Sequence, residues 1–141
     1  MSLDLTSLAK AVDALEAAVK VAGDAAFMSK LSREQSDTIR SGVVQSFEFT
    51  YELCWKFIQR WLKENQSLEE AALPRTRKDL FRMAARHGLL EDAEPWFEYG
   101  DARNMTSHTY DRDKARTVAE VAGRFASDAR ALLTRLESMH D

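Results

Sequence analysis

The sequence lacks several features on which particular classes of protein depend. It has a single cysteine, Cys54, which cannot form an internal disulfide. A disulfide scaffold is therefore excluded, and a cytoplasmic protein is the simplest interpretation. Because no run of about 18 apolar residues occurs, we expect no membrane-spanning helix. The N-terminus has no basic segment followed by an apolar stretch, so we expect no signal peptide.

Glycine and proline are also scarce, and the chain has no excess of positive charge. Two prolines and five glycines leave long uninterrupted segments, and none of these alternates apolar and polar residues as a half-buried strand does. The net charge of −3 argues against tight nucleic-acid binding by charge alone. One cluster of basic residues is typical of a solvated helix face but leaves room for a small basic site: Arg75, Arg77, Lys78, Arg82 and Arg86.

Apolar residues recur at intervals of three and four, which predicts helices through most of the chain. We expect residues 66–75 to be a linker and Ser32 to begin a helix through a capping box with Gln35. The predicted helices span residues 3–22, 32–65, 76–87, 92–107 and 112–139. We therefore expect one all-α domain over residues 1–141, an antiparallel up-and-down bundle of about five helices with a short helix inserted.

The second predicted helix is apolar on two sides. Its main stripe consists of Val44, Phe47, Tyr51, Cys54, Ile58 and Trp61. Phe49, Leu53 and Phe57 form another row, roughly opposite Phe47. Such a helix lies either at the centre of a bundle or against a partner chain, and we expect a homodimer that uses part of this surface. Cys54 belongs to the main stripe, so we interpret it as a core residue rather than a nucleophile.

The polar segment 101–113 contains the best candidates for chemistry. Arg103 carries a permanent planar charge that suits phosphate oxygens, and His108 can exchange a proton near neutral pH. His108 could act as a general base or acid at a ribose 2′-hydroxyl or a leaving oxygen, while Arg103 stabilises charge on phosphorus. The three histidines are far apart and no glycine-rich phosphate loop occurs, so we expect no metal site and no cofactor.

Helical geometry complicates the pairing of these two side chains. In a continuous helix, positions 103 and 108 differ by about 140°, whereas Asn104 and His108 share a face. Arg103 and His108 meet at one phosphate only if the helix loosens near residue 107 or if two copies face each other in a dimer. The alternative is that Arg103 pairs with Glu48 or Glu52 and that His108 merely ends a helix.

Three segments carry a resemblance to a known family. They are Phe47-Glu-Phe-Thr-Tyr-Glu-Leu-Cys-Trp-Lys56, Arg82-Met-Ala-Ala-Arg-His-Gly-Leu-Leu90 and Arg103-Asn-Met-Thr-Ser-His-Thr-Tyr110, of which the last has the pattern R-x4-H-x-Y. The chain resembles the HEPN superfamily and, within it, the small proteins encoded beside minimal nucleotidyltransferases. The resemblance covers most of the chain, with the three segments in the expected order. It implies antiparallel helices and a homodimer.

The resemblance implies two alternative functions. In one, the protein is a metal-independent ribonuclease toxin with Arg103 and His108 catalytic, Asn104 assisting, and residues of both protomers lining the cleft. Its partner, a minimal nucleotidyltransferase, is the antitoxin and adds AMP to Tyr110. In the other, the protein is a non-catalytic substrate-binding subunit of that nucleotidyltransferase. The intact Arg103 and His108 pair favours the first function, and the acidic net charge mildly favours the second. A structural dimer without a ligand is a third alternative.

The predicted inhibition is physically coherent. AMP on Tyr110 would place a phosphate two residues from His108, in the cleft that an RNA phosphate must enter. Both the negative charge and the bulk of the nucleotide would exclude RNA. Asp111 and Asp113 follow the motif and make its surroundings less basic, which leaves room for a protein that mainly binds its partner. Tyr110 could also simply pack its ring at the corner between the last two helices.

Overall fold

A computed structural model describes residues 3–72, 74–108 and 111–139, with only the backbone of His108. These residues form seven α-helices and one 3-10 helix and contain no strand, so the predicted all-α class is confirmed. None of the described helices is both long and apolar enough to cross a membrane. The elements are α1 (Thr6–Ala22), α2 (Ala25–Met28), α3 (Arg33–Asn65), α4 (Leu68–Ala72), α5 (Arg77–Arg86), α6 (Glu94–Met105), η1 (Thr106–His108) and α7 (Arg112–Ser138).

Local sequence signals determine where the longer helices begin and end. Ser32 and Gln35 form the predicted capping box, with hydrogen bonds of 3.1 and 2.9 Å. Gly88 follows the end of α5 with a φ of 81°, a conformation that glycine adopts without strain. Asp111 caps α7 by accepting hydrogen bonds from two backbone amides. The five predicted helices therefore correspond to α1, α3, α5, α6 and α7.

Two short helices were not expected from the sequence. Helix α2 lies in the connection between the first two long helices, where the carboxylate of Asp24 caps it by accepting from the amide of Phe27. Helix α4 occupies part of the segment 66–75 that we expected to be a linker. Each has too few residues for apolar periodicity to distinguish it from a loop. The expectation of about five helices is therefore too low for this fold.

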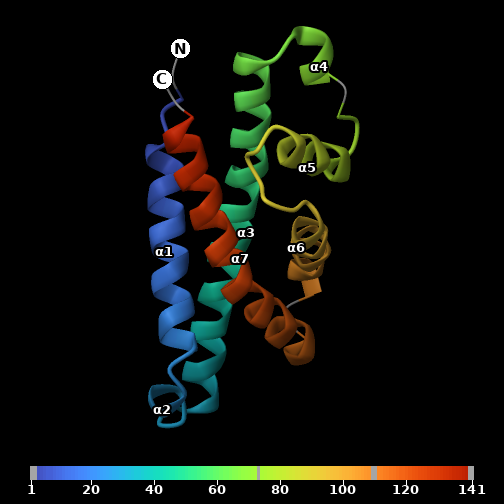
Figure 1. The fold of residues 1–141 in the computed structure, drawn as a ribbon. Coiled ribbons are helices and arrows are strands. Elements are labelled where there is room, and N and C mark those ends of the chain that lie inside the picture. The colour runs from blue at the N-terminus through green and yellow to red at the C-terminus, as the bar shows by residue number, and fades with distance from the viewer. Residues whose placement is uncertain (1–2, 73, 109–110, 140–141) are drawn as a thin grey trace.

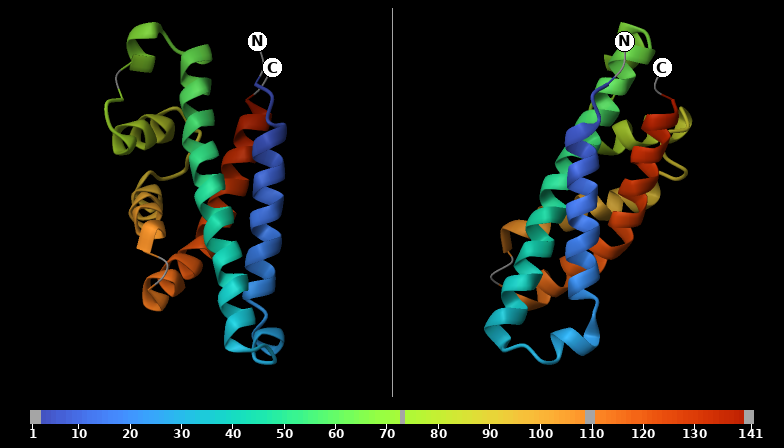
Figure 2. Two further views of the ribbon diagram at one scale, coloured as in Figure 1. Left: turned by 180° about the vertical axis from the view of Figure 1, so that it is seen from behind. Right: turned by 90° about the vertical axis from the view of Figure 1, so that its left-hand side faces the viewer.

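The long helices do not follow a strict up-and-down order (Figures 1 and 2). Helix α1 runs away from the end that holds both termini, and α3 and α7 both run back toward it. Helices α4, α5 and α6 lie along one side of α3 and connect the end of α3 to the start of α7. As a result α1 is antiparallel to both of its long neighbours, while α3 and α7 share a general direction. The sequence pattern gives helices but not these directions.

Helix α3 lies at the centre of the fold and packs against α1, α5, α6 and α7. Its predicted core stripe is buried from Val44 to Trp61. The second apolar row is only partly free, because Phe57 is buried, Leu53 is half-buried and Phe49 alone is 60% exposed. Of the two alternatives that the sequence left open, the central position therefore accounts for most of this apolar surface, and Phe49 is the part of the row that remains exposed.

An aromatic cluster centred on Phe125 of α7 fixes the position of α6. The centroid of the Phe125 ring lies 5.1 Å from that of Phe47 and 6.2 Å from that of Tyr51, both on α3. It also lies 5.6 Å from Trp96 and 5.1 Å from Tyr99, both on α6. Such tilted and edge-to-face pairs are favourable beyond the apolar area that they bury. The cluster ties three helices together and so determines where the C-terminal end of α6 lies.

Replacement of Phe125 tests the importance of this cluster. The change Phe125→Ala should lower the free energy of unfolding by about 3–5 kcal/mol, because it removes a fully buried ring and leaves a cavity. Urea denaturation followed by circular dichroism measures the loss. Leu68→Ala is the control, since Leu68 is 84% exposed and its removal should change stability by less than about 0.5 kcal/mol. Equal effects of the two changes would contradict this account of the core.

Candidate functional site

Arg103 lies in the last turn of α6, where two carboxylates of α3 hold its guanidinium group. Its Nε atom donates a hydrogen bond of 3.0 Å to Oε1 of Glu52, and its Nη1 atom lies 3.2 Å from Oε2 of Glu48. Glu48 and Glu52 are four residues apart, which places them on one face of α3. Of the pairings that the sequence left open, Arg103 therefore forms both at once.

Thr106, the first residue of η1, completes this network. Its hydroxyl oxygen accepts a 3.0 Å hydrogen bond from Nη1 of Arg103 and lies 2.6 Å from Oε2 of Glu48. The Arg103 side chain is 32% exposed, so the network lies at the edge of the core and not within it. Three side chains thus fix the orientation of the guanidinium group at the point where α6 passes into η1.

The charge of this network does not favour an anion. Glu48 and Glu52 carry two negative charges against the one positive charge of Arg103. The contacts of Arg103 use Nε and Nη1, and within the described residues Nη2 has no hydrogen-bond partner. Arginine has five N–H donors, so the two on Nη2 remain for a phosphate oxygen. The site can orient a phosphate, but the attraction that brings one there must come from other charges.

The structure describes only part of the predicted catalytic set. Helix α6 ends at Met105, and Thr106–His108 form a 3-10 turn, so the chain leaves α-helical winding near residue 107. Asn104 is exposed on the last turn of α6. The side chain of His108 and the whole of Tyr110 lie outside the described residues, so their roles stay predictions.

Sequence reasoning missed Trp55, which contacts this network, and the approach of Arg77 to Trp55. The indole nitrogen of Trp55 donates a 2.7 Å hydrogen bond to Oε2 of Glu52, and the guanidinium of Arg77 lies 4.2 Å from the centre of the Trp55 ring. Arg77 also donates a 3.4 Å hydrogen bond to the Tyr51 hydroxyl. Burial raises the pKa of Tyr51, and this hydrogen bond opposes the rise. The spacing of three between Glu52 and Trp55 was the available signal.

Two other residues discussed for the site have structural roles. Cys54 is fully buried and burial raises the pKa of its thiol, which confirms the interpretation as a core residue. The carboxylate of Asp111 accepts from the amides of Asp113 and Lys114. A carboxylate at this position complements the N-terminal end of the helix dipole. The role of Asp111 is therefore to cap α7.

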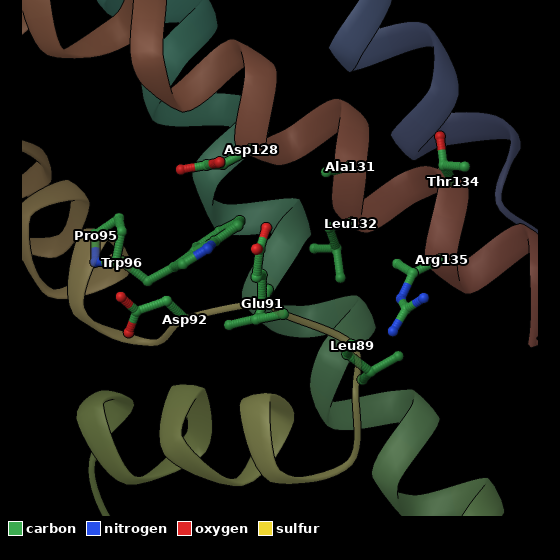
Figure 3. Close-up of a pocket in the computed structure, with 11 residues that line it drawn as sticks. Leu89, Glu91, Asp92, Pro95, Trp96, Asp128, Ala131, Leu132, Thr134 and Arg135 are labelled. Atoms are coloured by element: carbon green, nitrogen blue, oxygen red, sulfur yellow. The ribbon is translucent and has the colours of Figure 1, made fainter.

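A hollow of about 670 Å³ lies elsewhere on the molecule, between the α5–α6 connection and α7 (Figure 3). Its lining includes Trp96 and the carboxylates of Asp92 and Asp128, with Arg135 at one side. The Tyr99 hydroxyl donates to Asp128, and burial together with this contact raises the pKa of Tyr99. Its lining residues on α6 belong to the first turn, so the hollow is separate from Arg103. Within the described part of the chain, no cluster of three or more His, Cys, Asp or Glu side chains could hold a metal ion.

Comparison with known families places the chain in one of them. A family described as nucleotidyltransferase substrate binding protein like matches residues 3–138. The chain belongs to this family, and its predicted place among the nucleotidyltransferase-associated HEPN proteins is confirmed.

Individual relatives carry two different functional descriptions. The chain is 35% identical over 134 residues to a Haemophilus influenzae protein named probable ribonuclease HepT, covering 95% of this chain and 92% of that protein. A solved Haemophilus influenzae structure, described as the fold of a substrate binding domain of a nucleotidyltransferase, matches with a TM-score of 0.89 and 34% identity over 95% of this chain and 99% of that one. A solved Thermus thermophilus protein matches with a TM-score of 0.63 and 30% identity over 86% and 98% of the two chains.

Proposed function

We propose that this protein is a HEPN-type endoribonuclease, the toxin of a toxin–antitoxin pair, and that it cleaves RNA without a metal ion. The observation that carries the proposal is the oriented guanidinium of Arg103, five residues before His108, with Nη2 available to a phosphate. The relationship to a probable ribonuclease at 35% identity supports it. Arg103, His108 and Asn104 are the proposed catalytic residues.

In the proposed reaction His108 takes the proton of a ribose 2′-hydroxyl, whose oxygen then attacks the neighbouring phosphorus. As the new P–O2′ bond forms, the P–O5′ bond breaks and leaves a 2′,3′-cyclic phosphate. The leaving 5′-oxygen takes up the proton that His108 accepted, directly or through water, and becomes a 5′-hydroxyl. Nη2 of Arg103 donates to the phosphoryl oxygens as negative charge accumulates on them. Asn104, which is exposed on the last turn of α6, assists by hydrogen bonding to the RNA.

Substitution of the motif tests this reaction. Arg103→Ala and His108→Ala should each reduce the rate of RNA cleavage by about a hundredfold or more, because each removes a group that acts on the transition state. Cleavage of labelled RNA by purified protein and growth arrest on expression are the two measurements. Arg116→Ala is the matched control, since Arg116 is an exposed arginine of α7 outside the motif. The ribonuclease proposal fails if wild-type protein leaves RNA intact and is harmless without its partner.

We further propose that a partner nucleotidyltransferase neutralises the toxin by transferring AMP from ATP to the hydroxyl of Tyr110, with release of pyrophosphate. The family name, which refers to a nucleotidyltransferase, supports such a partner. The added phosphate would stand two residues from His108. Its negative charge and the bulk of the nucleotide would keep RNA out of the site.

Mass spectrometry after incubation with the partner and ATP tests this control. We expect one AMP adduct on Tyr110, loss of RNA cleavage in the modified protein, and no adduct in Tyr110→Phe. Tyr51 and Tyr99 serve as internal controls, because both side chains are buried and should remain unmodified. Absence of the adduct, or modification of a different residue with loss of activity, would remove Tyr110 from the mechanism.

We also propose a homodimer as the functional unit, since two chains can supply motif residues to one cleft. Phe49, 60% exposed on the central helix α3, is the residue of that helix best placed for such an interface. Light scattering should give twice the chain mass of 16.0 kDa for wild type and the mass of one chain for Phe49→Glu. Leu68→Glu, at a more exposed position, should remain a dimer. A monomeric wild type would contradict the proposal.

The second candidate function is a non-catalytic substrate-binding subunit of the nucleotidyltransferase. The observation that favours it is the pairing of Arg103 with both Glu48 and Glu52, because a guanidinium so neutralised attracts phosphate weakly. The RNA cleavage assay separates the two functions. A pure binding subunit would have no cleavage activity for Arg103→Ala to abolish.

A further inference from the structure

An exposed surface where α3, α5 and α6 meet combines cations with aromatic rings. The α5 surface is defined by six residues: Trp55 and Lys56 of α3, Arg77, Lys78 and Arg82 of α5, and Phe97 of α6. The four cations are exposed and the two rings are half-buried against the core. In Figures 1 and 2, α5 and α6 lie one beyond the other along the same side of α3.

Each aromatic ring of the α5 surface carries cations close to it. The guanidinium of Arg77 lies 4.2 Å from the centre of the Trp55 ring. The Phe97 ring has the ammonium of Lys78 at 5.5 Å and the guanidinium of Arg82 at 5.1 Å. All three distances fall within the range of about 6 Å over which a ring attracts a cation. Cations restrained in this way lose less side-chain freedom when they bind a ligand.

The charge of the α5 surface is opposite to that of the whole chain. Its four cations face one carboxylate on the same helix, Asp79, which pairs with Arg82 at 3.1 Å. Lys56, Arg77 and Lys78 form no ion pair within the described residues. Asp101 is exposed and lies four residues beyond Phe97, on the same face of α6. The four cations and Asp79 thus leave an excess of three positive charges, with Glu52 and Asp101 at the edges of the surface, although the net charge of the chain is −3.

The α5 surface adjoins the Arg103 network through a single carboxylate. Oε2 of Glu52 accepts the 2.7 Å hydrogen bond of Trp55, and Oε1 of Glu52 accepts the 3.0 Å hydrogen bond of Arg103. One side of Glu52 therefore faces the α5 surface and the other faces the motif. Trp55 of the α5 surface and Arg103 of the motif are therefore joined through one side chain.

We propose that the α5 surface binds the single-stranded RNA on which the motif acts. Phosphates would lie on the cations, and unpaired bases would stack on the exposed parts of Trp55 and Phe97 or on the guanidinium plane of Arg77, as is usual for single-stranded RNA. An acidic protein would satisfy the cations but has no need of a ring beside each one. This inference rests on the proposed ribonuclease function, and it supplies the attraction for phosphate that the Arg103 network lacks.

Binding of a labelled oligonucleotide tests the inference. The probe is a fluorescein-labelled, 2′-O-methylated single-stranded RNA, which cannot be cleaved through its 2′-oxygen, and anisotropy is measured over a range of salt concentrations. The combined change Arg77→Gln, Lys78→Gln and Arg82→Gln should weaken binding roughly ten- to a hundredfold at low salt. Loss of three phosphate contacts should also reduce the slope of log affinity against log salt by about 2.

Two further variants separate charge from stacking. Phe97→Leu keeps an apolar side chain but removes the ring, so it should weaken binding about fivefold while the salt slope stays unchanged. The matched control, Lys10→Gln with Lys20→Gln and Lys30→Gln, also removes three positive charges, from exposed positions on α1 and after α2. It should bind the probe as wild type does. If the α5 triple variant has a lowered melting temperature, the single exposed change Lys78→Gln replaces it, with a smaller loss of slope expected.

The outcomes distinguish this inference from the proposed function. If wild type cleaves RNA and the α5 triple variant keeps the wild-type KM and salt slope, the inference is overturned and the ribonuclease stands. If wild type binds the probe through the α5 surface but cleaves nothing, the ribonuclease fails and the RNA-binding surface stands. Failure of wild type to bind the probe, or equal weakening by the control triple, also overturns the inference. So does an α5 variant that binds RNA normally but no longer binds the nucleotidyltransferase, which would indicate a protein-docking surface.

Discussion

The contact between Arg103 and the two carboxylates of α3 is the interaction on which the organisation of the site depends. It joins the end of α6 to the central helix, and through Thr106 it orders the start of η1. Partly exposed ion pairs contribute only about 0–1 kcal/mol to stability, whereas the loss of a buried aromatic ring costs about 3–5 kcal/mol. The cluster around Phe125 therefore positions α6, and the ion pairs orient one guanidinium at its end.

For the proposed ribonuclease function, this division of roles explains how an acidic chain can serve RNA chemistry. At physiological salt the screening length is about 8 Å, so an RNA strand responds to the charges nearest to it and hardly to the net charge. The Arg103 network has an excess of one negative charge, and the α5 surface beside it has an excess of positive charge. The proposals thus assign the capture of RNA and the action on RNA to adjacent groups of residues that share Glu52.

The parts of the fold that follow from local periodicity could be predicted from the sequence. The core stripe of α3, the capping box at Ser32 and the cap at Asp111 all depend on residues within one or two helical turns. The short helices α2 and α4 could not be predicted, because a helix of about one turn is too short to show a repeat of apolar residues. The shared direction of α3 and α7 also depends on how the intervening helices pack, which the pattern of a single helix does not contain.

Even less of the site than of the fold could be predicted from the sequence. Arg103 and its motif stood out in the sequence, but its contact with Glu52 joins residues 51 positions apart, and the sequence offered it only as one alternative. The covering of the row that contains Phe57 was left open, because a helical projection shows which residues share a face but not which neighbours cover that face. The approach of Arg77 to Trp55 likewise exists only after α5 has packed against α3.

The most direct test of this account is to observe Arg103 itself as RNA binds. In nuclear magnetic resonance spectra of ¹⁵N-labelled protein, the Nε–H signal of Arg103, assigned by its absence in Arg103→Lys, reports the bond to Glu52. The account predicts that this signal shifts saturably during titration with the non-cleavable RNA, with the same affinity that anisotropy gives. An Arg103 signal that stays unchanged while the RNA binds would contradict the claim that this guanidinium receives the phosphate.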